Sequence, residues 1–91
     1  MYITQPLPNN TGVLFVYNKY TYKTFWMKNT FIPLDILLLD RNYKIVCIHT
    51  NTIPLNTQQL ICENKIMNAV ETNAGFVKTN NIKIGDYLLL H

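Results

Sequence analysis

The chain has 91 residues, a formal net charge of +3 and a hydrophobic share of 48%. This length suits one hydrophobic core and is too short for two, so we expect a single domain over residues 1–91 and exclude a multidomain enzyme. The eight Lys and Arg residues are scattered along the chain. They form no cluster of the kind that marks nucleic-acid sites, so we expect no nucleic-acid partner.

Nothing in the sequence predicts a membrane segment or an export signal. No apolar run approaches the roughly 20 residues that a membrane-spanning helix needs. Residues 1–12 contain two prolines and neither Lys nor Arg, which is unlike a secretory leader. We therefore expect a cytoplasmic or organelle-internal protein. The chain is rich in Asn, Ile, Lys and Tyr, a bias typical of an AT-rich genome.

Cys47 and Cys62 stand fifteen positions apart, and the chain has no CxxC motif and only two His residues. Such spacing assembles neither a zinc site nor a thioredoxin-like motif, so we expect no metal and no other cofactor. We expect two reduced, mainly structural thiols. The alternative is a disulfide, which requires an oxidising compartment and two Cα atoms within bridging distance.

Short apolar stretches separated by turn-forming residues predict a mostly β chain of about six short strands. β-branched and aromatic residues favour strands, whereas Asn, Asp, Gly and Pro favour the turns between them. The predicted strands are residues 13–17, 23–27, 34–39, 44–50, 66–71 and 87–90. Pro33 has no amide donor, so we expect residues 28–33 to be an irregular crossing. The nearly continuous apolar run at 34–39 predicts burial on both faces.

Local turn and cap signals complete the predicted order of elements. Turn chemistry at residues 40–43 joins the third and fourth strands as an antiparallel hairpin. The polar segment 51–64 is the longest predicted loop, with a short turn or strand near Leu60. Thr72 or Asn73 is expected to cap a short helix. These elements predict a small compact open barrel or a curved antiparallel sheet with one short helix.

Residues 25–36 (FWMKNTFIPLDI) resemble the signature of the DUF192 family almost residue for residue. Residues 71–76 (ETNAGF) resemble the family's Glu-x-Asn-Ala-Gly-aromatic segment. Residues 82–86 (IKIGD) resemble its closing Gly-Asp turn, and residues 7–15, from Leu7-Pro8 to Phe15, resemble its first core strand. The resemblance covers nearly the whole chain. It implies a small mostly β fold with one helix and an uncharacterised role.

The chain also departs from the family pattern. Where members carry Pro, Arg and Tyr before the conserved Glu, this chain reads KIMNAV at residues 65–70. A ligand pocket built on those family side chains would be altered here. The amino-terminal strand of the family is expected to be missing, as is the export leader of its fuller members. We therefore expect a shortened, divergent member with an exposed strand edge.

Four polar residues form the candidate site: Lys28, Asn29, Asp35 and Glu71. Asp35 and Glu71 occupy the edges of apolar strands, where a buried charge needs a partner. Two carboxylates and a lysine around a cleft suit general acid/base catalysis. We favour the alternative of a structural network, in which Asp35 accepts amides of residues 28–30 and Glu71 pairs with Lys28. Asn29 either fixes its own loop or faces a ligand.

Trp26 and Asn73 are candidate ligand contacts. A lone Trp in a strand of so small a domain is more often a core anchor than a stacking platform, so we expect Trp26 to be buried. Met27 is likewise expected to pack in the core. We expect no role for His49, because no Cys or Ser motif accompanies it.

The sequence contains no complete catalytic constellation, so the leading hypothesis is a non-enzymatic binding or accessory module. One alternative is a small hydrolase or lyase that uses Asp35 and Glu71. Another is an assembly protein that forms a homodimer or binds a protein partner through an exposed strand edge. Whether the protein is an enzyme is left open at this point.

Overall fold

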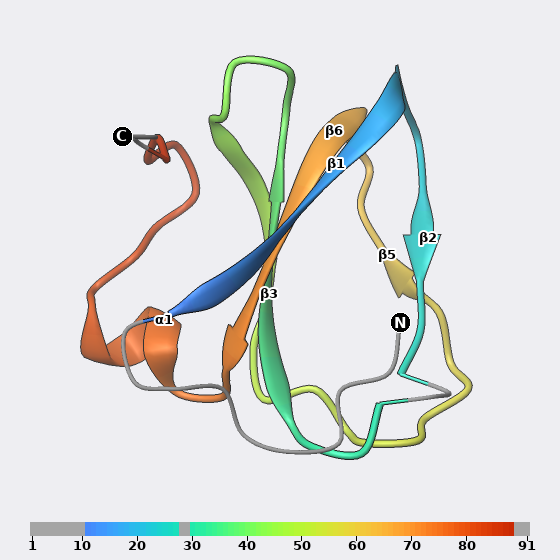
Figure 1. Ribbon diagram of the computed structural model, residues 1–91, viewed down its shortest axis with the longest axis vertical. Coiled ribbons are helices and arrows are strands. Elements are labelled where there is room, and N and C mark those ends of the chain that lie inside the picture. The colour runs from blue at the N-terminus through green and yellow to red at the C-terminus, as the bar shows by residue number, and fades with distance from the viewer. Residues whose placement is uncertain (1–10, 28–29, 89–91) are drawn as a thin grey trace.

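The computed structural model describes residues 11–27 and 30–88 (Figure 1). Within these residues the chain forms six strands and one helix. The elements are β1 (Gly12–Thr21), β2 (Thr24–Phe25), β3 (Leu34–Leu39), β4 (Ile45–His49), β5 (Leu60–Ile61), β6 (Ile66–Asn73) and α1 (Phe76–Thr79). An antiparallel sheet has the order β1-β6-β3-β4, and β2 pairs with β5 in a second sheet. The mostly β fold is confirmed, although the sheets do not close into a barrel.

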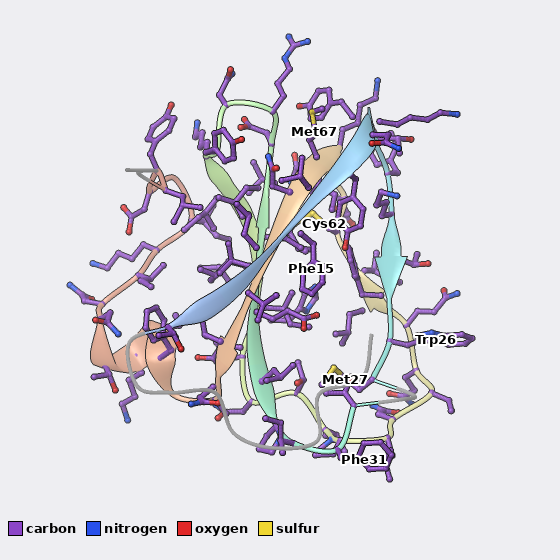
Figure 2. The ribbon with its side chains drawn as sticks, in the orientation of Figure 1. Phe15, Trp26, Met27, Phe31, Cys62 and Met67 are labelled. Atoms are coloured by element: carbon purple, nitrogen blue, oxygen red, sulfur yellow. A yellow bond between two sulfur atoms is a disulfide. The ribbon has the colours of Figure 1, made fainter. Side chains whose placement is uncertain are left out.

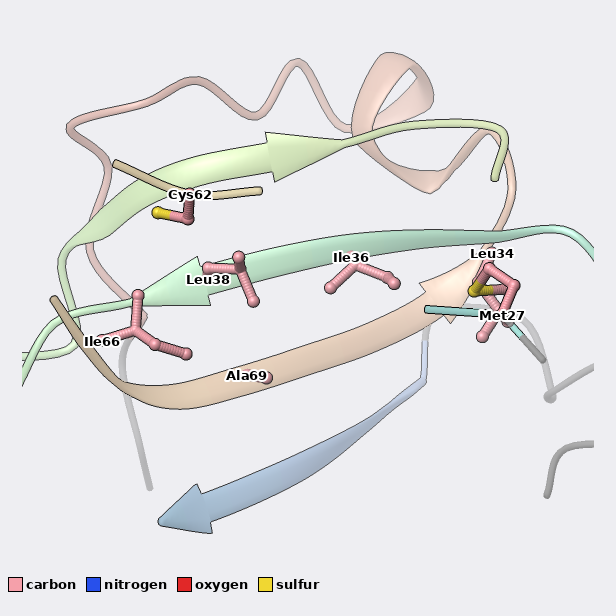
Figure 3. Close-up of a cluster of buried hydrophobic side chains, with 7 residues drawn as sticks. All are labelled: Met27, Leu34, Ile36, Leu38, Cys62, Ile66 and Ala69. Carbon is pink, nitrogen blue, oxygen red and sulfur yellow. The ribbon is translucent and has the colours of Figure 1, made fainter. Parts of the chain in front are cut away.

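The central strand β3 carries the core on both of its faces. All six of its residues are buried, as the unbroken apolar run predicts. Leu34, Ile36 and Leu38 point to one face, and Leu37 and Leu39 point to the other. Figure 3 shows the first of these clusters, whose buried members are Met27, Leu34, Ile36, Leu38, Cys62, Ile66 and Ala69.

The hairpin that joins β3 and β4 is confirmed. One carboxylate oxygen of Asp40 accepts the amides of Asn42, at 2.8 Å, and Lys44, at 3.0 Å. Tyr43 adopts a left-handed conformation with φ of 64° inside the turn. The register shifts between Leu38 and Leu39, where the ladder is irregular. The Asp side chain therefore takes the place of backbone partners in this turn, as Asx turns do.

Strand β1 is longer than predicted and lies against β6. It runs through residues 18–21, where we expect an interruption; the interruption is instead a register irregularity between Val16 and Thr21. Gly12 lies opposite Thr72. A Cβ at Gly12 would lie 3.0 Å from Val70 Cγ1 and 3.2 Å from the carbonyl oxygen of Glu71. The close approach of these two strands therefore requires glycine.

The predicted strand at residues 87–90 is wrong in its described part. Tyr87 makes only an isolated bridge to Lys44, and residues 89–90 lie outside the described residues. The amide of Leu88 donates to the carbonyl oxygen of Tyr43 at 2.9 Å. The amide of Gly85 donates to the carbonyl oxygen of Ile45, and the amide of Ile45 donates to that of Asp86, both at 2.8 Å. The segment therefore pairs briefly with the start of β4 without forming a strand there. The sixth described strand is β5, near Leu60.

The expectation of two reduced thiols is wrong, because Cys47 and Cys62 form a disulfide with their Cα atoms 6.0 Å apart. Cys47 lies on β4, and Cys62 directly follows β5. The bond therefore ties the four-stranded sheet to the two-stranded one. Sequence spacing could not reveal this, because the distance depends on how the two sheets pack.

The predicted side-chain cap of the helix is also wrong. Gly75, with φ of 96°, occupies the N-cap position of α1 and makes no side-chain cap bond, so neither Thr72 nor Asn73 is the cap residue. The helix has four residues, of which Val77 is buried. No helix in the described chain has the length and apolar character needed to cross a membrane.

Candidate functional site

Strand pairing decides which side chains share a face of the sheet. On β3 and β6, Ile36 lies opposite Glu71, and Asp35 lies opposite Thr72. Residues opposite one another in antiparallel strands point to the same face, and neighbours along a strand point to opposite faces. Glu71 therefore lies on the face of Ile36, and Asp35 lies on the other face. The structure does not bring these two carboxylates into one site.

Asp35 is fully buried and accepts backbone amides with both carboxylate oxygens. Oδ1 accepts the amide of Asn51 at 2.9 Å. Oδ2 accepts the amides of Gly75, at 3.1 Å, and Val77, at 2.9 Å. The sequence predicts donors at residues 28–30, whereas the described donors come from the loop after β4 and from the start of α1. Asp35 thus supplies from β3 the cap that α1 lacks locally.

Glu71 is buried in a different way. Its side chain is 5% exposed. Its Oε2 atom is enclosed and has no hydrogen-bond partner among the described residues. Burial raises the pKa of this carboxyl to about 7. Lys28, the partner expected for Glu71, lies outside the described residues with Asn29, so that ion pair stays a prediction.

A cavity of about 260 Å³ lies beside Glu71 on the core face of the sheet. Four strands contribute to it, together with the segment that follows β2. The lining residues are Tyr17, Thr24, Phe25, Trp26, Thr30, Ile36 and Glu71. No basic side chain occurs among these described lining residues. Glu71 is therefore the one carboxyl group in this described lining, and no cationic side chain of the lining balances it.

Aromatic rings stand next to the carboxylate. The ring centroids of Tyr17 and Phe25 are 6.2 Å apart, and the ring planes are tilted by 56°. Burial raises the pKa of Tyr17, and the negative charge of Glu71 raises it further, so the phenol stays neutral. Lys23 Nζ lies 4.4 Å from the Tyr17 ring centroid. Lys23 lines a neighbouring cavity together with Tyr17, and not the cavity of Glu71.

The expectation that Trp26 is buried is wrong, because this side chain is 54% exposed. Met27 is 2% exposed and takes the core position beside it. Figure 2 shows Trp26 pointing outward beyond β2 and Met27 pointing inward. An extended chain sends successive side chains to opposite sides, so only one of the two can enter the core. Trp26 nevertheless lines the cavity, and its role as a ligand contact stays a prediction.

A larger cavity, of about 550 Å³, lies on the other face of the sheet. Its lining is mainly apolar and includes Leu37, Val70 and Phe76. In Figure 1, α1 lies on the opposite side of β3 and β6 from β2 and β5. The two cavities are thus separated by the sheet, and Glu71 lines only the smaller one.

Residues 1–90 match the family model of DUF192, which is described as uncharacterized ACR. This match covers nearly the entire chain. The chain belongs to the DUF192 family. Four of the seven residues that line the Glu71 cavity in this DUF192 domain lie in the segment 25–36 that resembles the family signature: Phe25, Trp26, Thr30 and Ile36.

Two crystal structures resemble this DUF192 domain closely. A protein of unknown function from Novosphingobium aromaticivorans has a TM-score of 0.88 and 30% sequence identity, over 94% of this chain and 61% of that chain. A "putative transcription regulator" from Sinorhizobium meliloti has a TM-score of 0.87 and 33% identity, over 96% of this chain and 67% of that one. This chain thus spans less than two thirds of the first relative. No curated protein matches it significantly.

Two further residues of the DUF192 domain were weighed from sequence. Asn73 lies at the end of β6 opposite Leu34, and it does not line the Glu71 cavity. His49 lies opposite Ile36 on β4, in the same cross-strand row as Glu71. Its Nε2 atom is buried without a hydrogen-bond partner in the described chain. The position of His49 beside Glu71 follows from the register of β3 with β4 and β6, so it can be predicted only when the strand pairing is known.

The described residues hold no group of three or more potential metal ligands.

Proposed function

We propose that this protein is a non-enzymatic binding module that holds a small ligand in the Glu71 cavity. The observation that carries the proposal is that Glu71, whose enclosed Oε2 atom has no partner among the described residues, belongs to the lining of a cavity. An unpaired buried carboxylate costs free energy that a ligand with donor groups recovers. A cavity whose lining includes a buried titratable group with a shifted pKa is the default hypothesis for a binding site.

The geometry favours binding over acid/base catalysis. A hydrolase or lyase built on Asp35 and Glu71 needs both carboxylates at one substrate, but the sheet separates them. Asp35 is also engaged by described amides through both oxygens. One carboxylate beside two aromatic rings is suited to hold a ligand in place. Among the described lining residues, no second carboxylate and no histidine accompanies it for proton transfer in both directions.

Amide NMR spectra of the labelled protein, titrated with a library of small polar and charged fragments, test the proposal. We expect shift changes at Tyr17, Phe25 and Glu71 for the fragments that bind. Glu71→Gln should abolish these changes, because the variant keeps the shape of the side chain and removes its charge. Glu63→Gln is the matched control, since Glu63 is exposed and lies outside the cavity.

Two results would contradict the proposal. Shift changes that gather around Leu37 and Phe76 would place ligands in the larger cavity on the other face. Changes around Glu71 that persist unaltered in Glu71→Gln would show that the carboxylate is not part of the site.

A second candidate function is pairing with a second copy or another protein through a strand edge. The observation that favours it is the position of β1, which is ten residues long and forms one edge of the four-stranded sheet. Val16 on this strand is 60% exposed. An open strand edge with apolar side chains invites a further strand.

A further inference from the structure

We propose that the ligand of the Glu71 cavity is a small organic cation, either a protonated amine or an alkylammonium group. This inference rests on the proposed function and names the chemical class of the ligand. It follows from three properties of the cavity: the charge of its wall, the aromatic rings beside that charge, and its size.

The described part of the wall carries negative charge. Glu71 is the one acidic residue among the described lining residues, and no Lys, Arg or His accompanies it there. A carboxylate that is 5% exposed pays a desolvation cost that a neutral donor offsets only in part. An opposite charge offsets more of this cost, because charge-assisted hydrogen bonds are stronger than neutral ones. A cationic group is therefore the best complement to this wall.

Aromatic rings supply the second part of a cation site. Tyr17 and Phe25 line the cavity with their ring planes tilted by 56°, so the two rings present faces in different directions. The face of an aromatic ring carries partial negative charge and attracts ammonium groups. The Tyr17 ring already attracts a cation in this structure, since Lys23 Nζ lies 4.4 Å from its centroid. Lys23 does so from a neighbouring cavity, so its charge does not fill the Glu71 cavity.

The volume limits the ligand to a small molecule or a side-chain-sized group. About 260 Å³ is slightly below the roughly 300–1,000 Å³ of pockets for drug-sized ligands. An ammonium head group with a short carbon chain suits such a space. The remaining lining side chains are two threonines, which provide hydroxyls, one aliphatic residue and a third aromatic ring: Thr24, Thr30, Ile36 and Trp26.

A charged probe and its uncharged isostere test the inference. The probes are choline and the alcohol in which a tert-butyl group replaces the trimethylammonium group. Binding of each to the full chain is measured by amide NMR titration at constant ionic strength. We expect choline to bind at least about tenfold more tightly than the alcohol, because only choline interacts with the carboxylate and the ring faces. Butylammonium and butanol form a second pair for a primary amine.

Substitutions place the effect at this cavity. Glu71→Gln should remove the preference for the charged probe, and Tyr17→Leu should weaken choline binding about tenfold through loss of a ring face. Glu63→Gln removes the same charge from an exposed position and should change neither affinity. A far-ultraviolet spectrum and a thermal melt of each variant confirm that it is folded before binding is compared.

The outcomes separate the two proposals. Equal affinity for each charged probe and its isostere, with shift changes still centred on Glu71, would overturn the cation class and leave the binding module standing. No shift change near Glu71 with any probe or fragment would overturn both. Choline binding that occurs only in Lys28→Met would identify Lys28 as the cation of this cavity and would overturn the inference of an external ligand.

Discussion

Asp35 shows how one side chain joins three parts of the chain. Its carboxylate accepts the amides of Asn51, Gly75 and Val77, which belong to a loop and to the start of α1. An ionised carboxylate can accept all of these bonds, whereas an amide side chain has one acceptor oxygen and directs its own donors at amide hydrogens.

We expect Asp35→Asn to lower the free energy of unfolding by about 3 kcal/mol, because buried donors lose their acceptor. Urea denaturation of the two proteins measures the difference. Asp40→Asn is a suitable control, since Asp40 accepts amides in an exposed turn and should cost about 1 kcal/mol. Equal losses for the two variants would show that Asp35 does not hold α1 in place.

Glu71 should make stability depend on pH. Its pKa of about 7 in the folded protein exceeds the ordinary value of 4.5, so the folded state holds the proton more tightly than the unfolded state. The free energy of unfolding should therefore fall as pH rises from 4.5 to 7, by at most roughly 3 kcal/mol, and should stay level above pH 7. Water that enters the cavity lessens the desolvation of Glu71, so it makes this fall in the free energy of unfolding smaller.

The measurement compares urea unfolding of the protein and of Glu71→Gln at several pH values in that range. The variant should be more stable than the parent at pH 8 and similar to it at pH 4.5. Tyr17, whose pKa is raised by burial, stays neutral across this range, and both Lys23 and His49 are present in the two proteins. A parallel pH dependence in the two proteins would contradict the assignment.

The elements that local sequence predicts well are those whose bonds are local. The β3–β4 hairpin forms around Asp40, whose carboxylate accepts the amides of Asn42 and Lys44, two and four residues further along the chain. The helix differs, because its cap comes from β3, some forty residues earlier in the chain. Thr72 and Asn73 have the right chemistry for a cap, but both belong to β6. A distant acceptor thus replaces the nearby one that sequence favours.

The disulfide should contribute substantially to stability, because it links β4 to the segment after β5. Closing a loop of 15 residues stabilises a protein by about 3 kcal/mol in the chain-entropy description. We expect a reducing agent to lower the thermal midpoint by several degrees.

A double variant, Cys47→Ala with Cys62→Ala, supplies the control for the disulfide. It should melt near the temperature of the reduced protein and should not respond to the reducing agent. A parent protein whose midpoint is unchanged by full reduction, with thiol content verified by labelling, would contradict this contribution.

At the scale of the whole molecule, the exposed edge of β1 predicts self-association. Val16→Lys places a charge on this strand, where charged side chains prevent edge pairing. If strand-edge pairing is the function, we expect light scattering to give a dimer mass for the parent and a monomer mass for the variant. A monomer mass for the parent at high concentration would remove this candidate function.

The sequence alone determined the features that depend on periodicity and turn chemistry. These are the mostly β class, the hairpin at residues 40–43, the burial of β3 on both of its faces and the resemblance to DUF192 along the chain. Each can be predicted because near neighbours in the chain decide it.

The tertiary structure determined which side chains come together at the site. Which face Glu71 occupies depends on its register against Ile36, and one residue of slippage would send it to the face of Asp35. Packing of the two sheets brings Cys47 and Cys62 together and assigns the core position to Met27 instead of Trp26. These outcomes depend on contacts between distant strands, and no local pattern of residues contains that information.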